Sequence, residues 1–118
     1  MKYSGWDYID HMVDTCKELS ECMEGIHTEE DFINSVLVRR AAVMCLLDLG
    51  ELFSGLGDDE KNLFVSDHWH RIIGFRNRSA HGYHTMDFRL VYSIVVNRVP
   101  PIYEFLKQQQ ARLRETSN

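Results

Sequence analysis

Residues 34–54 read NSVLVRRAAVMCLLDLGELFS and carry apolar side chains almost all the way round a helix. This pattern predicts a helix that is buried on more than one side, either at the centre of a bundle or against another copy of the chain. Strand-like alternation is nowhere convincing, and only Pro100 and Pro101 interrupt the 118 residues. The sequence therefore favours an all-α fold.

Helical periodicity bounded by capping residues and glycines predicts the remaining helices. They are expected at residues 4–25, 28–32 and 66–82, and from Asp87 onward. A turn is expected at residues 55–59, with a short helical segment after it. Pro100 and Pro101 remove two amide donors, so the last helix should kink or break near Asn97. The polar tail from about residue 108 is expected to fray.

These segments predict an up-and-down bundle of four to five helices that forms one domain over residues 1–118. No signal peptide is recognisable at the start, and no apolar run reaches membrane-spanning length. The cysteines, Cys16, Cys22 and Cys45, are odd in number and lack zinc-ligand spacing. Free thiols in a reducing compartment are the natural state of such residues, so a cytoplasmic protein without membrane contact is expected.

The formal net charge of −5 argues against a protein that coats nucleic acid through its overall charge. The positive and titratable groups are nevertheless uneven. One short stretch contains Arg71, Arg76, Arg78, Arg89, His68, His70, His81 and His84. We interpret this as an acidic body around one cationic site.

Arg76 is the residue of this stretch that stands out. It lies near the middle of an apolar stripe with Trp69, Ile72 and Ile73 on the predicted helix 66–82. A guanidinium in that position is costly unless it is paired or faces an anion. Two explanations stay open: a structural ion pair with Glu51 or Asp48, or a binding site for a phosphate.

His81 and Tyr83 follow Arg76 closely. Arginine binds phosphate, histidine transfers protons near neutral pH, and tyrosine donates a hydroxyl. These groups suffice to break an RNA phosphodiester without a metal. Arg76 and His81 lie about 140° apart on a regular helix. A two-fold dimer that places two copies of both residues in one groove would remove this difficulty, and we favour it.

The residues resemble the HEPN superfamily, whose mark is an arginine, four to six intervening residues and a histidine. The chain is particularly similar to the HepT-like toxins, in which a tyrosine follows two residues after the histidine. Here these are Arg76, His81 and Tyr83, with Asn77 as the polar residue after the arginine. The likeness extends to the segments 49–51 and 69–77, and to Asp87 and Pro100. Ser79 and Ala80 depart from it, because a leucine–valine pair is common before the histidine.

The resemblance implies a dimeric helical bundle with a metal-independent ribonuclease site at the dimer interface. It also implies a neighbouring minimal nucleotidyltransferase (MNT) antitoxin that transfers AMP onto Tyr83. Such a modification would add negative charge beside the arginine and exclude phosphate.

We therefore expect an endoribonuclease toxin in which Arg76 binds the scissile phosphate and His81 is the general base or acid. Supporting positions are Asn77, Tyr83 and Glu51, and possible RNA contacts are Arg78, Arg71 and His84. No metal or cofactor is expected. One alternative is a non-catalytic subunit that presents nucleotide or substrate to a nucleotidyltransferase. Another is a structural dimerisation domain in which Glu51 merely holds Arg76.

Overall fold

The computed structural model describes residues 5–64, 66–78 and 82–116, and every regular element within these ranges is helical. In chain order the elements are α1 (Gly5–Cys22), α2 (Glu29–Ile33), α3 (Val36–Ser54), α4 (Asp58–Lys61), the 3₁₀ turn η1 (Asn62–Phe64), α5 (Asp67–Arg78), the 3₁₀ turn η3 (Tyr83–Thr85), α6 (Phe88–Asn97) and α7 (Val99–Thr116). The predicted all-α fold is confirmed.

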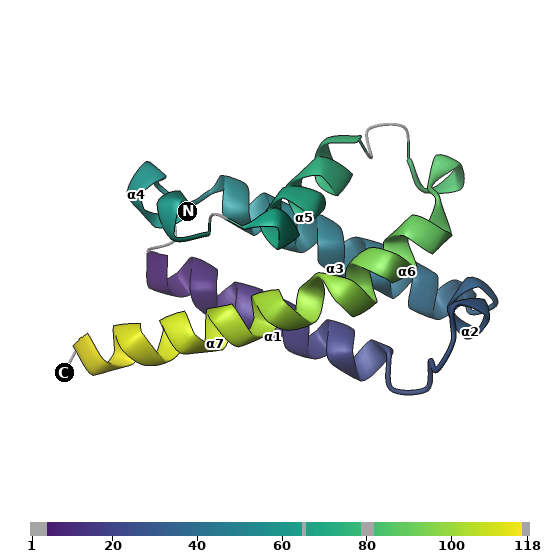
Figure 1. Cartoon of the computed structure of the whole chain (residues 1–118), viewed down its shortest axis with the longest axis horizontal. Coiled ribbons are helices and arrows are strands. Elements are labelled where there is room, and N and C mark those ends of the chain that lie inside the picture. The colour runs from purple at the N-terminus through teal and green to yellow at the C-terminus, as the bar shows by residue number, and fades with distance from the viewer. Residues whose placement is uncertain (1–4, 65, 79–81, 117–118) are drawn as a thin grey trace.

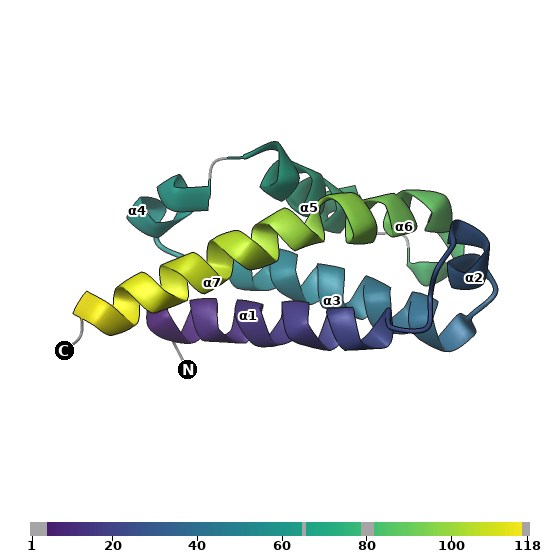
Figure 2. The ribbon, with the colours of Figure 1, turned by 60° about the horizontal axis from the view of Figure 1, so that its bottom comes forward.

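The long helices run up and down along one axis, with α6 and α7 together forming the last pass (Figure 1). Figure 2 shows α1 and α3 side by side in one layer, while α5 and α6 lie on the other side of α3. α3 packs against α1, α2, α5 and α6, as its apolar sequence predicts. It is the helix from which the candidate site is built.

One apolar core joins all the long helices. From α1 it receives Ile9, Met12, Cys16 and Leu19, from α3 chiefly Ala42, Leu46 and Leu49, and from the later helices Ile72, Val91, Ile102 and Leu106. Each large side chain buried in this way stabilises the fold by roughly 1.5–3 kcal/mol. The outer face of α3 stays open, because the side chains of Leu37 and Met44 are 83% and 59% exposed.

Capping residues fix several helix boundaries where the sequence indicates them. Thr28 and Asp31 form a reciprocal capping box at the start of α2. The Asp87 carboxylate accepts hydrogen bonds from the amides of Arg89 and Leu90 at the start of α6. The expected break in the last helix is confirmed and falls at Arg98, just before the two prolines.

The ends of α7 and α5 complete the helix boundaries. In the described residues α7 continues as a helix to Thr116, beyond the point near residue 108 from which the polar tail was expected to fray. Gln110 donates to Asp10 at 2.6 Å and Leu113 packs on the core, so tertiary contacts order these turns. In the described residues α5 runs to Arg78, and Gly82, where the helix was expected to end, has a φ of +91° that lies outside helical space. The expected helix start at Ser4 lies outside the described residues.

Aromatic side chains fix the beginning of α5 against its neighbours. The ring centroids of Phe64 and Trp69 are 5.2 Å apart, and Phe53 of α3 and Phe105 of α7 complete the cluster. Such contacts add about 0.5–1.5 kcal/mol each beyond the burial of area. The crossing of α5 over α3 is thereby set, and with it the place of Arg76. Among the described helices, none is both long and apolar enough to cross a membrane.

Candidate functional site

Arg76 projects from α5 onto the outer side of α3, where its guanidinium meets Glu51. Its Nη2 lies 2.7 Å from Oε2 of Glu51, a carboxylate 25 residues earlier in the chain. The side chains of Arg76 and Glu51 are 34% and 71% exposed, so the pair opens to solvent. Of the two partners expected from the sequence, Glu51 is therefore the one that Arg76 contacts. Because the pair is exposed, an incoming anion can reach the guanidinium.

The α3 backbone makes room for the stem of Arg76. Gly50 is buried directly beneath it, and a glycine at this position lets α5 approach α3 closely. The glycine–glutamate step of α3 thus has two separable effects on one arginine. Gly50 provides the space for its stem, and Glu51 binds its head group.

Acidic groups continue from Glu51 across to α1. A hollow of about 340 Å³ is lined by His11, Asp14, Thr15, Glu18, Asp48, Glu51 and Leu52. Partial burial and the nearby charge of Glu51 raise the pKa of Asp48. Within the described ranges, no three His, Cys, Asp or Glu side chains are grouped so that they could hold a metal ion. Glu51 therefore stands at the border between this acidic hollow and the cation Arg76.

Tyr83 opens the 3₁₀ turn η3, which follows Gly82. Its ring packs against Phe88, with centroids 5.0 Å apart, and the guanidinium of Arg40 lies 4.3 Å above the ring centroid. The phenol oxygen is shielded from solvent and has no hydrogen-bond partner among the described residues. The acceptor oxygen expected from the sequence is therefore covered in this arrangement.

Arg40 is a residue near Tyr83 that was not among the positions expected from the sequence. It is exposed on α3, and its neighbour Arg39 lies 4.8 Å over the Phe88 ring and donates to the Ile33 carbonyl at 2.7 Å. A signal was present in the sequence. Arg40 shares one side of the helix with Glu51 and has no acidic residue three or four positions away.

The remaining predicted positions are more dispersed. Asn77 and His84 are exposed, and the His84 and Tyr83 ring centroids are 6.0 Å apart. Arg78 lies back over Gly74 and lines a small hollow at the end of α5. Arg71 turns toward the beginning of its helix, where it pairs with Asp67 at 3.8 Å. His81, the predicted acid or base, lies outside the described residues.

Comparison with known proteins places these residues in a family. The chain matches the sequence profile of the family described as "Ribonuclease HepT-like" over residues 12–109, which include both α3 and the Arg76–Tyr83 segment. The chain belongs to this HepT-like family. The predicted membership of the HepT-like branch is thereby confirmed, and the family description makes the chain a ribonuclease relative.

Several curated proteins resemble this HepT-like chain along most of their length. "Putative RNase TTE0752" from Caldanaerobacter subterraneus subsp. tengcongensis is 26% identical over 86% of this chain and 89% of the relative. "Putative RNase MJ1380" from Methanocaldococcus jannaschii is 27% identical over 80% and 86%. "Probable ribonuclease HepT" from Thermococcus cleftensis is 24% identical over 86% and 92%. No solved structure gives a significant match.

The cysteines of this HepT-like chain are free thiols. Burial raises the pKa of Cys16 to about 12, with a smaller contribution from Cys45. Burial likewise raises the pKa of Cys45 to about 11, with smaller contributions from nearby groups, of which Cys22 is the largest. Thiols held protonated in this way are poor nucleophiles at neutral pH. The expectation of free, buried thiols is confirmed for Cys16 and Cys45, whereas Cys22 is half-buried.

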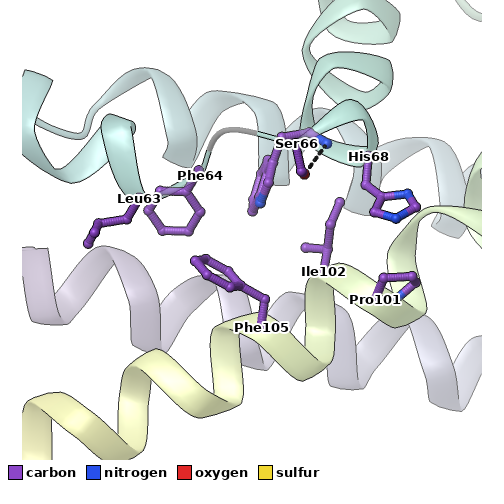
Figure 3. A pocket seen from close by; sticks show the side chains of 8 residues that line it. Leu63, Phe64, Ser66, His68, Pro101, Ile102 and Phe105 are labelled. Atoms are coloured by element: carbon purple, nitrogen blue, oxygen red, sulfur yellow. Dashed lines mark hydrogen bonds between the residues drawn. The ribbon is translucent and has the colours of Figure 1, made fainter.

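A separate apolar hollow of about 160 Å³ lies between η1, the start of α5 and α7 (Figure 3). Its walls are mostly aromatic and aliphatic, with Ser66 and His68 as polar members. The ring of His68 faces Arg98, whose Nη1 lies 3.4 Å from Nδ1 and also bonds Asp67 at 2.8 Å. His68 is thus part of a contact between α5 and the α6–α7 junction.

Proposed function

We propose that this HepT-like chain is a metal-independent endoribonuclease toxin whose site is centred on Arg76. The observation that carries the proposal is the exposed Arg76–Glu51 pair, which holds a guanidinium at the surface within the segment that the family match covers. A guanidinium binds phosphate with two parallel hydrogen bonds and keeps its charge at any physiological pH. Arg76 can therefore bind the scissile phosphate and stabilise the charge that builds up on it.

The proposed reaction is an in-line displacement at phosphorus. His81 removes the proton from the ribose 2′-oxygen, which forms a bond to phosphorus while the bond to the 5′-oxygen breaks. An acid, the second histidine in a dimer, protonates the departing 5′-oxygen. Asn77 would orient His81 or a phosphate oxygen. Arg71, Arg78 and His84 would contact the flanking RNA, and binding would require Arg71 to exchange its weak pairing with Asp67.

We further propose a homodimer with α3 at its interface. Leu37 and Met44 are seven residues apart, lie on one side of α3 and are exposed, which favours burial by a second copy of the chain. Glu51 and Arg40 lie at the edge of the same face, toward α5 and η3. A two-fold axis through this face would place two Arg76 sites along one groove.

The antitoxin in this proposal is an MNT-type nucleotidyltransferase that uses Tyr83 as its acceptor. The phenol oxygen would attack the α-phosphorus of ATP, forming a phosphodiester to AMP and releasing pyrophosphate. Because that oxygen is covered, η3 must move before the transfer, and Gly82 at φ +91° supplies the backbone freedom next to it. The added negative charge beside Arg40 would repel an RNA phosphate.

A growth experiment tests the proposal and separates it from the binding-subunit alternative. Expression of the chain without its antitoxin is expected to arrest growth, and His81→Ala and Arg76→Ala are expected to relieve the arrest at equal protein levels. Free thiols and an RNA substrate are both consistent with action in the cytoplasm. Absence of arrest with a folded, unmodified wild-type chain would favour a non-catalytic subunit.

A further inference from the structure

We infer that Arg40 forms a second phosphate subsite, which binds the backbone of the RNA strand some nucleotides away from the phosphate held by Arg76. The inference rests on the proposed ribonuclease function and adds to it that the RNA substrate must be long enough to reach both arginines. Three observations support it: Arg40 stacks on the ring of Tyr83, no counter-charge lies beside it in the described part of the chain, and it lies far along α3 from Glu51, the partner of Arg76.

Arg40 is held in place by an aromatic ring. Its guanidinium lies 4.3 Å over the centroid of Tyr83, and Tyr83 is itself supported by Phe88. Stacking on a ring face restricts the long side chain before any ligand arrives, while the N–H donors at the rim of the guanidinium stay available. A pre-organised cation of this kind loses little freedom when it binds an anion.

Arg40 also has no neutralising group among the described residues. Its neighbours three and four positions away on α3 are Val36, Leu37, Val43 and Met44, none of which is charged. Its contact with the Tyr83 ring is the interaction that the described part of the chain gives it. Arg39 differs, because its Nη1 already donates to the Ile33 carbonyl. Arg76 differs as well, because it is paired with Glu51. An exposed, unneutralised arginine on an acidic chain is suited to an external anion.

The spacing assigns Arg40 to a different phosphate from Arg76. Arg40 and Glu51 are eleven residues apart, which on an α-helix places them within about 20° of the same side and about 16 Å apart along the axis. That separation is longer than the distance between neighbouring phosphates of an extended strand. The two arginines therefore mark a track along one edge of α3, with Tyr83 and Phe88 beside its far end.

The inference is tested by salt-dependent binding of a twelve-nucleotide RNA with 2′-O-methyl riboses, which lacks the hydroxyl needed for cleavage. The protein is produced without antitoxin, and mass spectrometry verifies that Tyr83 is unmodified. Arg40→Ala is expected to weaken binding about tenfold at low salt. It should also reduce the slope of log K against log salt by about 0.7, the value for one phosphate contact on a single strand.

Two further variants distinguish a loss of the Arg40 charge from a general loss of charge and from a loss of the support that Tyr83 gives to Arg40. Arg112→Ala removes one positive charge from an exposed position in the last turns of α7, the helix whose C-terminal end lies away from α2 (Figure 1). This variant is expected to change neither affinity nor slope. Tyr83→Leu removes the supporting ring but keeps the charge of Arg40, so affinity should fall while the slope stays unchanged. Circular dichroism verifies folding, and Arg40→Gln replaces Arg40→Ala if the alanine variant is unstable.

The outcomes distinguish this inference from the proposed function. Wild-type binding with an unchanged affinity and slope in Arg40→Ala would overturn the Arg40 subsite and leave the ribonuclease proposal standing. A folded wild-type chain that neither binds this RNA nor cleaves unmodified RNA would overturn the proposed function itself. A loss of affinity in Arg40→Ala without any change of slope would also overturn the subsite, because it would show a structural role only.

Discussion

Gly50 lies directly under the stem of Arg76. A Cβ atom added to Gly50 would come 3.0 Å from both Cβ and Cδ of Arg76, closer than side-chain carbons normally approach. The next residue, Glu51, binds the guanidinium of the same arginine. Two consecutive residues of α3 thus determine where Arg76 points, and this coupling can be tested by substitution.

Gly50→Ala is expected to reduce RNA cleavage about tenfold or more, because Arg76 must shift and small displacements of a phosphate-binding group are costly to catalysis. Alanine favours a helix by about 0.5–1 kcal/mol over glycine, which offsets the strain, so the free energy of unfolding should change by less than about 1 kcal/mol. Urea unfolding and a cleavage assay measure the two effects. Gly25→Ala is the matched control, because a Cβ added there would meet no atom of the described residues within 4 Å. An active Gly50→Ala would show that the position of Arg76 is not critical.

Glu51→Ala and Arg76→Ala are each expected to lower the free energy of unfolding by no more than about 1 kcal/mol. The reason is that both side chains are substantially exposed, and exposed ion pairs contribute little to stability. The purely structural alternative requires the cost of breaking a buried pair, on the order of 3–5 kcal/mol. Urea denaturation of both single variants and the double variant decides between them. A loss in the higher range for Arg76→Ala would favour the structural role.

Tyr83→Phe is expected to leave the free energy of unfolding unchanged or to raise it by up to about 1 kcal/mol. The hydroxyl it removes is shielded and has no partner among the described residues, so no hydrogen bond is lost. The same variant should take up no label from ATP labelled in its α-phosphate when the antitoxin is present. Labelling of Tyr83→Phe equal to that of the wild type would move the acceptor to another residue.

Cys16 is expected to make stability fall at alkaline pH. Burial, with a smaller contribution from Cys45, raises the pKa of Cys16 from 9.0 to about 12. The unfolded chain therefore loses its proton above about pH 9 while the folded chain keeps it. The stabilisation is complete below pH 9 and is lost as the pH rises toward 12, at a rate on the order of 1 kcal/mol per pH unit.

Urea unfolding of the wild type and Cys16→Ala between pH 8 and pH 10.5 checks this effect. The difference in stability between the two should shrink as the pH rises, since other groups titrate equally in both. A difference that stays constant over the range would show that the Cys16 thiol ionises in the folded chain as it does in the unfolded one.

The helices could be predicted because their signals are local. A long run of apolar residues indicated α3, and short-range capping by Thr28 and Asp87 marked the starts of α2 and α6. The end of α7 could not be predicted in this way. Its last turns are polar in sequence, and the contact that orders them joins Gln110 to Asp10 across 100 residues.

The candidate site shows the same division between local and long-range signals. Arg76 was conspicuous because it is a cation in an apolar stripe. Its need for an acidic partner limited the candidates for an ion pair to Glu51 and Asp48. The choice between these two depends on the crossing of α5 over α3, which the aromatic cluster around Trp69 fixes. The contact of Arg40 with Tyr83 depends on where η3 lies relative to α3, and the periodicity of the sequence does not indicate that position.

The most direct test of the central claim is cleavage of total RNA by the purified protein in EDTA, with wild type beside Arg76→Ala and His81→Ala. We expect the wild type alone to cleave, which would establish a metal-independent ribonuclease that depends on these two residues. Equal cleavage by all three proteins, or none by a folded wild type with unmodified Tyr83, would contradict the proposed function.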